Sequence, residues 1–165
     1  MGNGNGLQNL QVLELMYEMN RQFFLRPATE TDFPEIKTLI RQVRINPTGL
    51  DWRRFTVAVI GEEMIGCGQL KPVPGGLTEL ASLAVRPPYR HQGIARALIE
   101  KLLVDAPRPV YLTCRSKLGE LYAKFGFQVL SPEEMPPYYR RLQRLAGLLM
   151  ELARRGETLF VMKLG

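Results

Sequence analysis

Residues 80–104 of this 165-residue chain read LASLAV, RPPYRHQGIAR and ALIEKLLV in succession. The first six are apolar or small, a length and composition typical of a strand buried on both faces. Pro87 and Pro88 end the strand because proline has no N–H to give to a ladder. From Gly93 onward apolar residues recur at every third or fourth position, which predicts a helix with one broad apolar face. The segment therefore predicts a strand, a tight loop and a helix.

The loop between this strand and this helix has the composition of an anion-binding site. The first N–H groups of a helix have no partner within the helix and lie at the positive end of its dipole. Gly93 lets an anion approach those amides, and Arg90, His91 and Arg96 add charge around it. Several cations suit a pyrophosphate better than a single carboxylate. The alternative is an ordinary helix N-terminus with solvated arginines.

Two short motifs resemble one protein family. The pattern Arg90-x-x-Gly93-x-Ala95 resembles the acyl-CoA-binding motif of the GNAT superfamily of N-acetyltransferases, which has Gln or Arg, two residues, Gly, one residue, and Gly or Ala. Residues 121–127, LYAKFGF, are similar to the family's segment after the cofactor helix and fifth strand. The resemblance covers about residues 23–164. It implies an α/β (α+β) fold with a mixed, mostly antiparallel central sheet flanked by helices.

Periodicity and turn residues predict the rest of the chain. We expect a single N-acetyltransferase domain over residues 23–165, and an extension over residues 1–22 that is disordered or forms a short helix near 7–20. An amphipathic helix at about 138–155 precedes the last strand, where the family often has a shorter connection. The other expected elements are a helix capped by Thr29 or Thr31 and reaching Val43, a loop over 71–76, a helix over 117–125, and strands over 23–29, 55–60, 64–70, 110–115, 127–130 and 158–164.

The composition is that of an ordinary soluble globular protein, with 45% hydrophobic and 23% charged residues. No apolar run is long enough to span a bilayer, and the first residues lack a secretory or myristoylation signal, so we expect no membrane partner. A cytoplasmic location is the default, and an organellar origin stays open. The net charge of +6 suggests an anionic ligand without choosing among phosphate, nucleic acid and acidic protein.

The cysteine and histidine content argues against a metal site. Cys67 and Cys114 both lie inside expected strands, which favours two buried thiols over a disulfide or a metal site. His91 is the one histidine, so most histidine-based metal sets are ruled out. We expect no metal. Cys114 is also a poor nucleophile candidate, because a catalytic thiol needs a nearby base.

The resemblance implies acetyl-CoA as the acetyl donor and direct transfer to a primary amine of a small molecule or a protein. It places the pantetheine arm along the backbone of Leu83, Ala84 and Val85, which also supplies an N–H to polarise the thioester carbonyl. It places the pyrophosphate on the loop residues Arg90, His91, Gln92, Gly93, Ile94, Ala95 and Arg96.

Glu79 is the candidate base. It is the only carboxylate that flanks the central strand, and several GNAT enzymes carry a catalytic glutamate near this strand's start. A free glutamate titrates near about 4.3, so base chemistry near neutrality needs an apolar setting or a relaying water. The alternative is a surface glutamate at a strand entry.

Tyr122 is the candidate acid, because GNAT enzymes commonly place a tyrosine at this helical position beside the cofactor sulfur. The alternative is a core residue, since Leu118, Leu121, Tyr122 and Phe125 have the spacing of an inward-facing stripe. Residues that fall where the family's acceptor sites are walled are Trp52, Arg53, Arg54, Tyr138, Tyr139, Arg140 and Arg141.

Two other functions are compatible with the sequence. One is a catalytically silent GNAT-like domain that binds acyl-CoA without transferring its acyl group. The other is a nucleic-acid binder that uses the arginine-rich C-terminal helix, which the lack of interleaved exposed aromatics and of a known module argues against. We therefore expect no nucleic-acid partner. A homodimer through the extra helix or the N-terminal segment is also compatible with the sequence.

Overall fold

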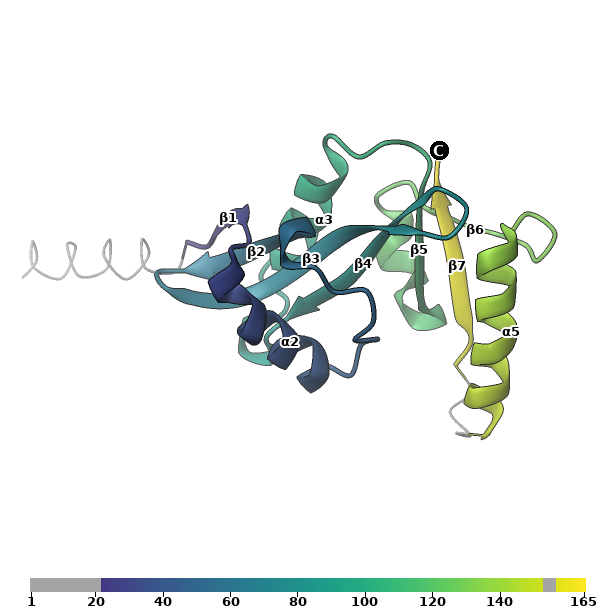
Figure 1. The fold of residues 1–165 in the computed structure, drawn as a ribbon, viewed down its shortest axis with the longest axis horizontal. Helices are drawn as coiled ribbons and strands as arrows, with labels where there is room; N and C mark the ends of the chain where they lie inside the picture. The colour runs from purple at the N-terminus through teal and green to yellow at the C-terminus, as the bar shows by residue number, and fades with distance from the viewer. Residues whose placement is uncertain (1–21, 153–156) are drawn as a thin grey trace, which may run out of the picture. The chain divides into compact units, whose positions relative to one another are not determined.

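The computed structural model describes residues 22–152 and 157–165. Seven strands form a sheet in the order β1-β2-β3-β4-β5-β7-β6, mixed and mostly antiparallel, which confirms the expected fold class (Figure 1). The strands are β1 Phe24–Pro27, β2 Phe55–Ile60, β3 Glu63–Val73, β4 Leu77–Val85, β5 Val110–Arg115, β6 Gln128–Val129 and β7 Leu159–Leu164. The α-helices of the described residues are α2 Phe33–Gln42, α3 Ile94–Leu103, α4 Gly119–Ala123 and α5 Pro137–Leu152. Short 3₁₀ turns are Glu30–Asp32, Trp52–Arg54, Pro87–Tyr89 and Ser116–Leu118.

The chain divides into two compact units. The first unit comprises the chain up to Cys67 together with Leu83–Ile99, and the second comprises Gly68–Ser82 and Glu100–Gly165. Strands β3 and β4 and helix α3 each contribute residues to both units. None of the described helices combines the length and the apolar character that crossing a membrane requires.

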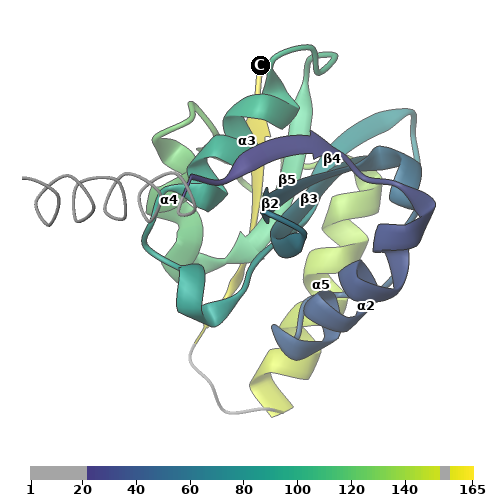
Figure 2. The same ribbon diagram turned by 90° about the vertical axis from the view of Figure 1, so that its left-hand side faces the viewer.

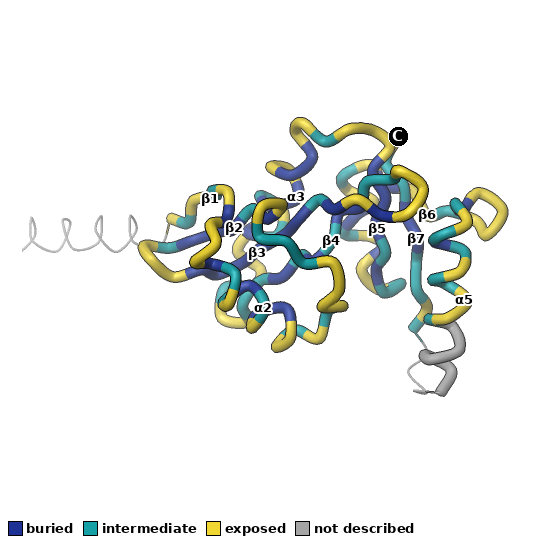
Figure 3. The backbone as a smooth tube through the Cα atoms, viewed as in Figure 1, coloured by how far each residue is buried: buried dark blue, intermediate teal, exposed yellow. Residues whose placement is uncertain are grey.

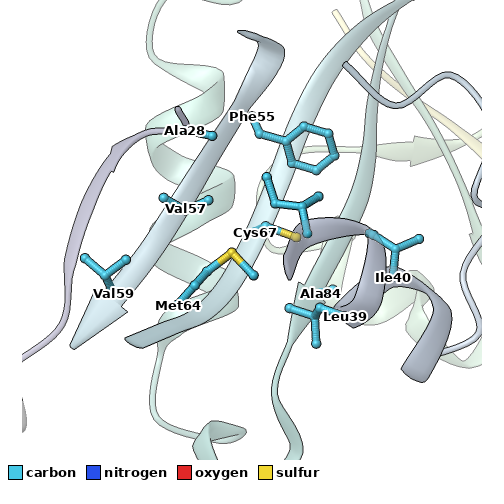
Figure 4. Close-up of a cluster of buried hydrophobic side chains, with 10 residues drawn as sticks. Ala28, Leu39, Ile40, Phe55, Val57, Val59, Met64, Cys67 and Ala84 are labelled. Carbon is cyan, nitrogen blue, oxygen red and sulfur yellow. The ribbon is translucent and has the colours of Figure 1, made fainter. Parts of the chain in front are cut away.

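The core of the first unit is formed between helix α2 and strands β2 and β3. Helix α2 buries Ile36, Leu39 and Ile40, which repeat at helical spacing. These side chains pack with Phe55, Met64 and other apolar residues of the same cluster, as Figure 4 shows. Cys67 belongs to this cluster and is a buried thiol that forms no disulfide, as the sequence predicts.

The entry to helix α2 is held by a charged cap. Asp32 accepts hydrogen bonds from the Thr29 N–H at 2.6 Å and the Thr29 hydroxyl at 2.8 Å. The Arg26 guanidinium pairs with both Asp32 oxygens, at 2.7 and 2.9 Å. Hydrogen bonding to Arg26 is the main cause that holds the pKa of Asp32 well below its ordinary value.

The second unit is built on β5 and β7. Strand β5 pairs in parallel with β4 through Thr78 and Val110 and through Glu79 and Tyr111, and it pairs antiparallel with β7 over its whole length. Strand β7 ends at the C-terminus beside β5 in both views (Figures 1 and 2). Helix α5 lies along β7, and over residues 137–146 buried and half-buried residues alternate with exposed ones (Figure 3).

Three expectations about elements are wrong in detail. Residues 71–73 continue β3 instead of opening a loop, with Pro72 at an exposed position between the buried Lys71 and Val73. Leu118 is 39% exposed and does not face inward. Helix α3 begins at Ile94, one residue after Gly93. The helix expected near residues 7–20 and the end of the helix expected at 153–155 lie outside the described residues.

Candidate functional site

The loop between β4 and α3 places a left-handed turn before an open space. After the 3₁₀ turn Pro87–Tyr89, His91 has φ 63° and Gly93 has φ 80°, and the helix then begins at Ile94. A Cβ added to Gly93 would meet no atom within 4 Å. The positive φ favours glycine, and the space beside its Cα is free of protein atoms. The space beside Gly93, at the start of α3, is therefore open to a ligand.

The side chains around this turn are positive or neutral. Arg90, His91, Gln92 and Gly93 are exposed, and the first turn of α3 carries no acidic residue. The Arg90 Nε donates to the Val85 carbonyl at 3.3 Å, and the Gln92 side chain donates to the Pro88 carbonyl at 3.2 Å. These bonds hold the loop in its turn. An anion at the helix N-terminus would meet N–H groups and cations with no competing carboxylate on that turn.

Two residues that motif reasoning missed anchor the loop. Arg86 forms an ion pair with Glu35 of α2, and its Nε donates to the Met64 carbonyl at 2.6 Å. The Tyr89 hydroxyl donates to Glu63 at 2.7 Å. Their partners lie more than twenty residues away in sequence, so no local pattern could have identified them.

The predicted pantetheine edge lies at the end of β4. Ala84 packs in the core that includes helix α2, whereas Leu83 and Val85 pack with the cluster of Ile94 and Leu98. All three side chains are thus used in packing, which leaves the backbone for any ligand contact. Strand β4 pairs in parallel with β5 at Thr78 and Glu79. Within the described second unit, residues 80–82 of β4 form no further pair with β5.

Glu79 is buried, so the alternative of a surface glutamate is wrong. The side chain is 5% exposed, and its Oε1 lies 3.5 Å from Nζ of Lys71, which is 9% exposed. Its Oε2 is buried and has no hydrogen-bond partner in the described part of the chain. The tyrosines of α5 lie near this carboxylate. The charge of Glu79 therefore helps to raise the pKa of both Tyr138 and Tyr139.

Tyr139 is the most deeply buried member of this group. It is 0% exposed, and its ring stacks on Tyr111 with a distance of 5.3 Å between ring centroids. Tyr138 packs edge-on against it, with a centroid distance of 4.9 Å. Burial first, and the Glu79 charge second, raise the pKa of Tyr139 far above that of a free phenol. Its hydroxyl makes no hydrogen bond of acceptable geometry with the described residues. The sequence placed Tyr138 and Tyr139 near an acceptor site without indicating that they surround Glu79.

Tyr122 has a different set of neighbours. It is 8% exposed on α4 and meets Phe127 edge-on at a centroid distance of 6.2 Å. Burial and the nearby Cys114 raise the pKa of Tyr122 to about 12, and burial raises the pKa of the Cys114 thiol to about 11. Both groups are protonated near neutral pH. Tyr122 is therefore a core residue whose hydroxyl keeps its proton. Cys114 is a reduced, buried and unreactive thiol.

The other predicted acceptor-site residues separate into two groups. Trp52, Arg53 and Arg54 line an open hollow of about 540 Å³ in the first unit, where Asp51 pairs with both arginines. Arg140 instead donates to main-chain carbonyls at 3.0 to 3.4 Å, which makes it a structural residue. No group of three His, Cys, Asp or Glu side chains in the described ranges is placed to hold a metal ion.

Comparisons with known proteins concern the family and the fold of the chain. The model of the acetyltransferase (GNAT) family matches residues 13–127, about 70% of the chain. A search of curated proteins returned no match.

Solved structures of low sequence identity share the fold. N-acetylglutamate synthase from Neisseria gonorrhoeae, complexed with coenzyme A and N-acetyl-glutamate, is 24% identical with a TM-score of 0.64 over 87% of this chain. This chain covers only 35% of that synthase. Rv2747 from Mycobacterium tuberculosis, in complex with CoA and NLQ, is 23% identical with a TM-score of 0.63, over 84% of this chain and 97% of that one. Ard1 from Thermoplasma volcanium is 13% identical with a TM-score of 0.60, over 86% of this chain and 96% of that one.

Proposed function

The chain belongs to the acetyltransferase (GNAT) family, and from this premise we propose that it transfers the acetyl group of acetyl-CoA directly to a primary amine. The observation that carries the proposal is the turn at Gly93, where open space and exposed cations lie at the start of helix α3. Solved structures with the same fold were determined with CoA, which supports the choice of donor. The acceptor and the cytoplasmic compartment stay predictions.

In the donor half, the N–H groups at the start of α3 and the side chains of Arg90 and Arg96 would hold the pyrophosphate. The backbone of residues 83–85 would hold the pantetheine arm and donate an N–H to the thioester carbonyl. Since the side chains of Leu83, Ala84 and Val85 pack in the core, substitutions there should act through the shape of the strand.

In the acceptor half, Glu79 would take a proton from the acceptor ammonium. The amine lone pair then attacks the thioester carbonyl carbon, the C–S bond breaks, and the CoA thiolate leaves and is protonated. Full proton transfer from Tyr122 to that thiolate would cost roughly 5 kcal/mol, because the pKa of Tyr122 is about 12 and that of a thiol about 8.5. We therefore infer that Tyr122 acts first by donating a hydrogen bond to the developing thiolate.

The first test is a thermal-shift titration with acetyl-CoA, with CoA and ATP as comparators. A ligand at a hundred times its Kd stabilises a protein by about 2.7 kcal/mol, which such a titration detects. Gly93→Glu should remove this stabilisation, because its side chain puts bulk and negative charge into the anion site.

Gly61→Glu is the matched control. Gly61 also has a positive φ, of 57°, and open space beside its Cα, but it lies in the turn between β2 and β3. Equal loss of the ligand-induced shift in both variants would contradict the assignment of the Gly93 turn. Stabilisation by acetyl-CoA without transfer to any amine of a panel would favour the silent acyl-CoA-binding domain.

The amine panel should include amino acids, polyamines and peptide N-termini. Glutamate is placed in it because the structure of the Neisseria synthase contains N-acetyl-glutamate.

A further inference from the structure

A buried group of charged and phenolic side chains occupies the second unit. Lys71 comes from the end of β3, Glu79 from β4, Tyr111 from β5, and Tyr138 and Tyr139 from α5. Lys71 and Glu79 are each less than 10% exposed. Burying a lysine and a glutamate is costly unless they pair and their remaining hydrogen-bonding capacity is satisfied. Such a pair needs an explanation beyond packing.

The pair leaves one side of the carboxylate unsatisfied. Lys71 Nζ approaches Oε1 at 3.5 Å, whereas Oε2 is buried without a hydrogen-bond partner in the described residues. The Tyr139 hydroxyl has the same deficit, and it lies near enough to Glu79 for the carboxylate charge to act on it. A phenol can donate and accept, and a carboxylate accepts. These two groups are therefore suited to each other, directly or through one shared water.

We propose that Lys71 and Tyr139 are positioning residues for Glu79: Lys71 holds the carboxylate ionised in the free enzyme, and the Tyr139 hydroxyl donates to it and orients it. The proposal rests on the proposed function, in which Glu79 takes the acceptor's proton. The step balances simply, since Glu79 carboxylate and R–NH₃⁺ become a carboxylic acid and R–NH₂. The acid returns its proton to solvent after the amine has attacked.

The surroundings determine which groups can set the charge of Glu79. In the described second unit the titratable groups around Glu79 are Lys71, Tyr111, Tyr138 and Tyr139. Burial keeps Tyr138 and Tyr139 protonated at neutral pH, so neither adds a charge. Lys71 is the one cation of the set, and its removal would leave a buried carboxylate without a counter-charge. Such a carboxylate binds a proton more readily.

The test is a pH titration of the Glu79 carboxyl by ¹³C NMR, with the resonance assigned by its loss in Glu79→Gln. In Lys71→Met we expect the carboxyl pKa to rise by at least one unit, and in Lys71→Arg to return close to that of the unmodified protein. An identical carboxyl titration in Lys71→Met and the unmodified protein would overturn the proposal. If Lys71→Met does not fold, Lys71→Gln carries the same expectation.

Kinetics give a second readout. The acid limb of the kcat/KM profile should move to higher pH in Lys71→Met by the same amount as the NMR titration. Tyr139→Phe should lower kcat several-fold while leaving the Kd of acetyl-CoA unchanged. The matched control is Tyr111→Phe, which removes the hydroxyl of the ring that stacks on Tyr139. A Tyr139→Phe variant that changes Tm alone, with kcat and the pH profile unmoved, would return Tyr139 to a packing role.

The NMR arm does not depend on catalysis. A shifted carboxyl titration in a protein that acetylates nothing would support the Lys71–Glu79 coupling while contradicting the proposed function. Transfer activity with an unmoved acid limb would support the function and overturn the role of Lys71.

Discussion

In the proposed function, the hydroxyl of Tyr122 acts only while it keeps its proton. Its pKa, raised to about 12 by burial and by Cys114, keeps the phenol neutral over any working pH. In Tyr122→Phe the ring packing against Phe127 is retained and the hydrogen bond to the thiolate is lost. We expect kcat to fall about 10²-fold, the usual size of the loss when one such donor is removed. Steady-state kinetics at saturating acetyl-CoA measure this effect.

The matched control for Tyr122→Phe is the Kd of acetyl-CoA, which should be unchanged because the ring remains in place. A kcat equal to that of the unmodified enzyme would mean that Tyr122 is a core residue and nothing more.

Asp32 is the clearest case of a charge that stabilises the first unit. Its lowered pKa means that the folded state stabilises the ionised carboxylate. The contribution of Asp32 to the free energy of unfolding is therefore present above the unfolded pKa, about 3.9, and is lost as the pH falls. Asp32→Asn should lower the free energy of unfolding at pH 7 by about 2 kcal/mol. Urea unfolding at a series of pH values measures the difference, which should shrink toward pH 2.

Asp51→Asn serves as the comparison, because Asp51 also caps a helical turn and pairs with arginines but is more exposed. A smaller loss is expected there. A pH-independent loss in Asp32→Asn would show that the cap acts by shape alone.

At the scale of elements, β3 and α3 meet at Gly66. A Cβ at this position would lie 3.0 Å from the Ala84 carbonyl oxygen and 3.2 Å from a methyl group of Ile94, so another element packs closely against this glycine. Gly66→Ala should therefore lower the free energy of unfolding by about 1 to 3 kcal/mol. It should also weaken acetyl-CoA binding, since Ala84 and Ile94 belong to the proposed donor site.

Gly61→Ala separates this effect from the general cost of replacing a glycine. It meets no atom within 4 Å, so it reports only the strain of a positive φ, about 1 kcal/mol. Acetyl-CoA affinity should be unaffected in that variant. Thermal unfolding with and without acetyl-CoA measures both quantities, and equal ligand shifts in the two variants would disprove the link to the donor site.

The elements that the sequence predicts well are those with a strong local period. Strands β2 and β5 begin and end where expected, because unbroken apolar runs are bounded by turn residues. The end of β3 was missed because Pro72 signals a break, whereas the strand continues through it to Val73. The exposure of Leu118 was missed because a helical stripe gives a spacing but not the length of the helix, and α4 begins only at Gly119.

At the scale of the molecule, the proposed donor and acceptor groups differ in how far sequence can predict them. The proposed donor group is contiguous, so Arg90, Gly93 and Ala95 indicate it within one motif. The proposed acceptor group comes from residues up to 68 positions apart, from Lys71 to Tyr139. No pattern near Glu79 in the sequence shows that residues of β3 and α5 bury it, so the sequence is also compatible with a surface position.

The net charge of +6 leads to a prediction about salt. If exposed cations at the Gly93 turn hold the phosphates of acetyl-CoA, the Kd should rise several-fold between about 0.05 and 0.5 M salt, because screening shortens the range of these attractions. The double variant Arg90→Gln and Arg96→Gln should bind acetyl-CoA more weakly at low salt, and its Kd should depend less steeply on salt.

The control is the double variant Arg41→Gln and Arg44→Gln, which removes the same charge from exposed positions of the first unit and should keep the original salt dependence of the Kd. Isothermal titration at four salt concentrations decides between a local site and a general effect of net charge, since a general effect would give both double variants the same slope. A labelled single-stranded oligonucleotide bound more tightly than acetyl-CoA would instead favour the nucleic-acid alternative.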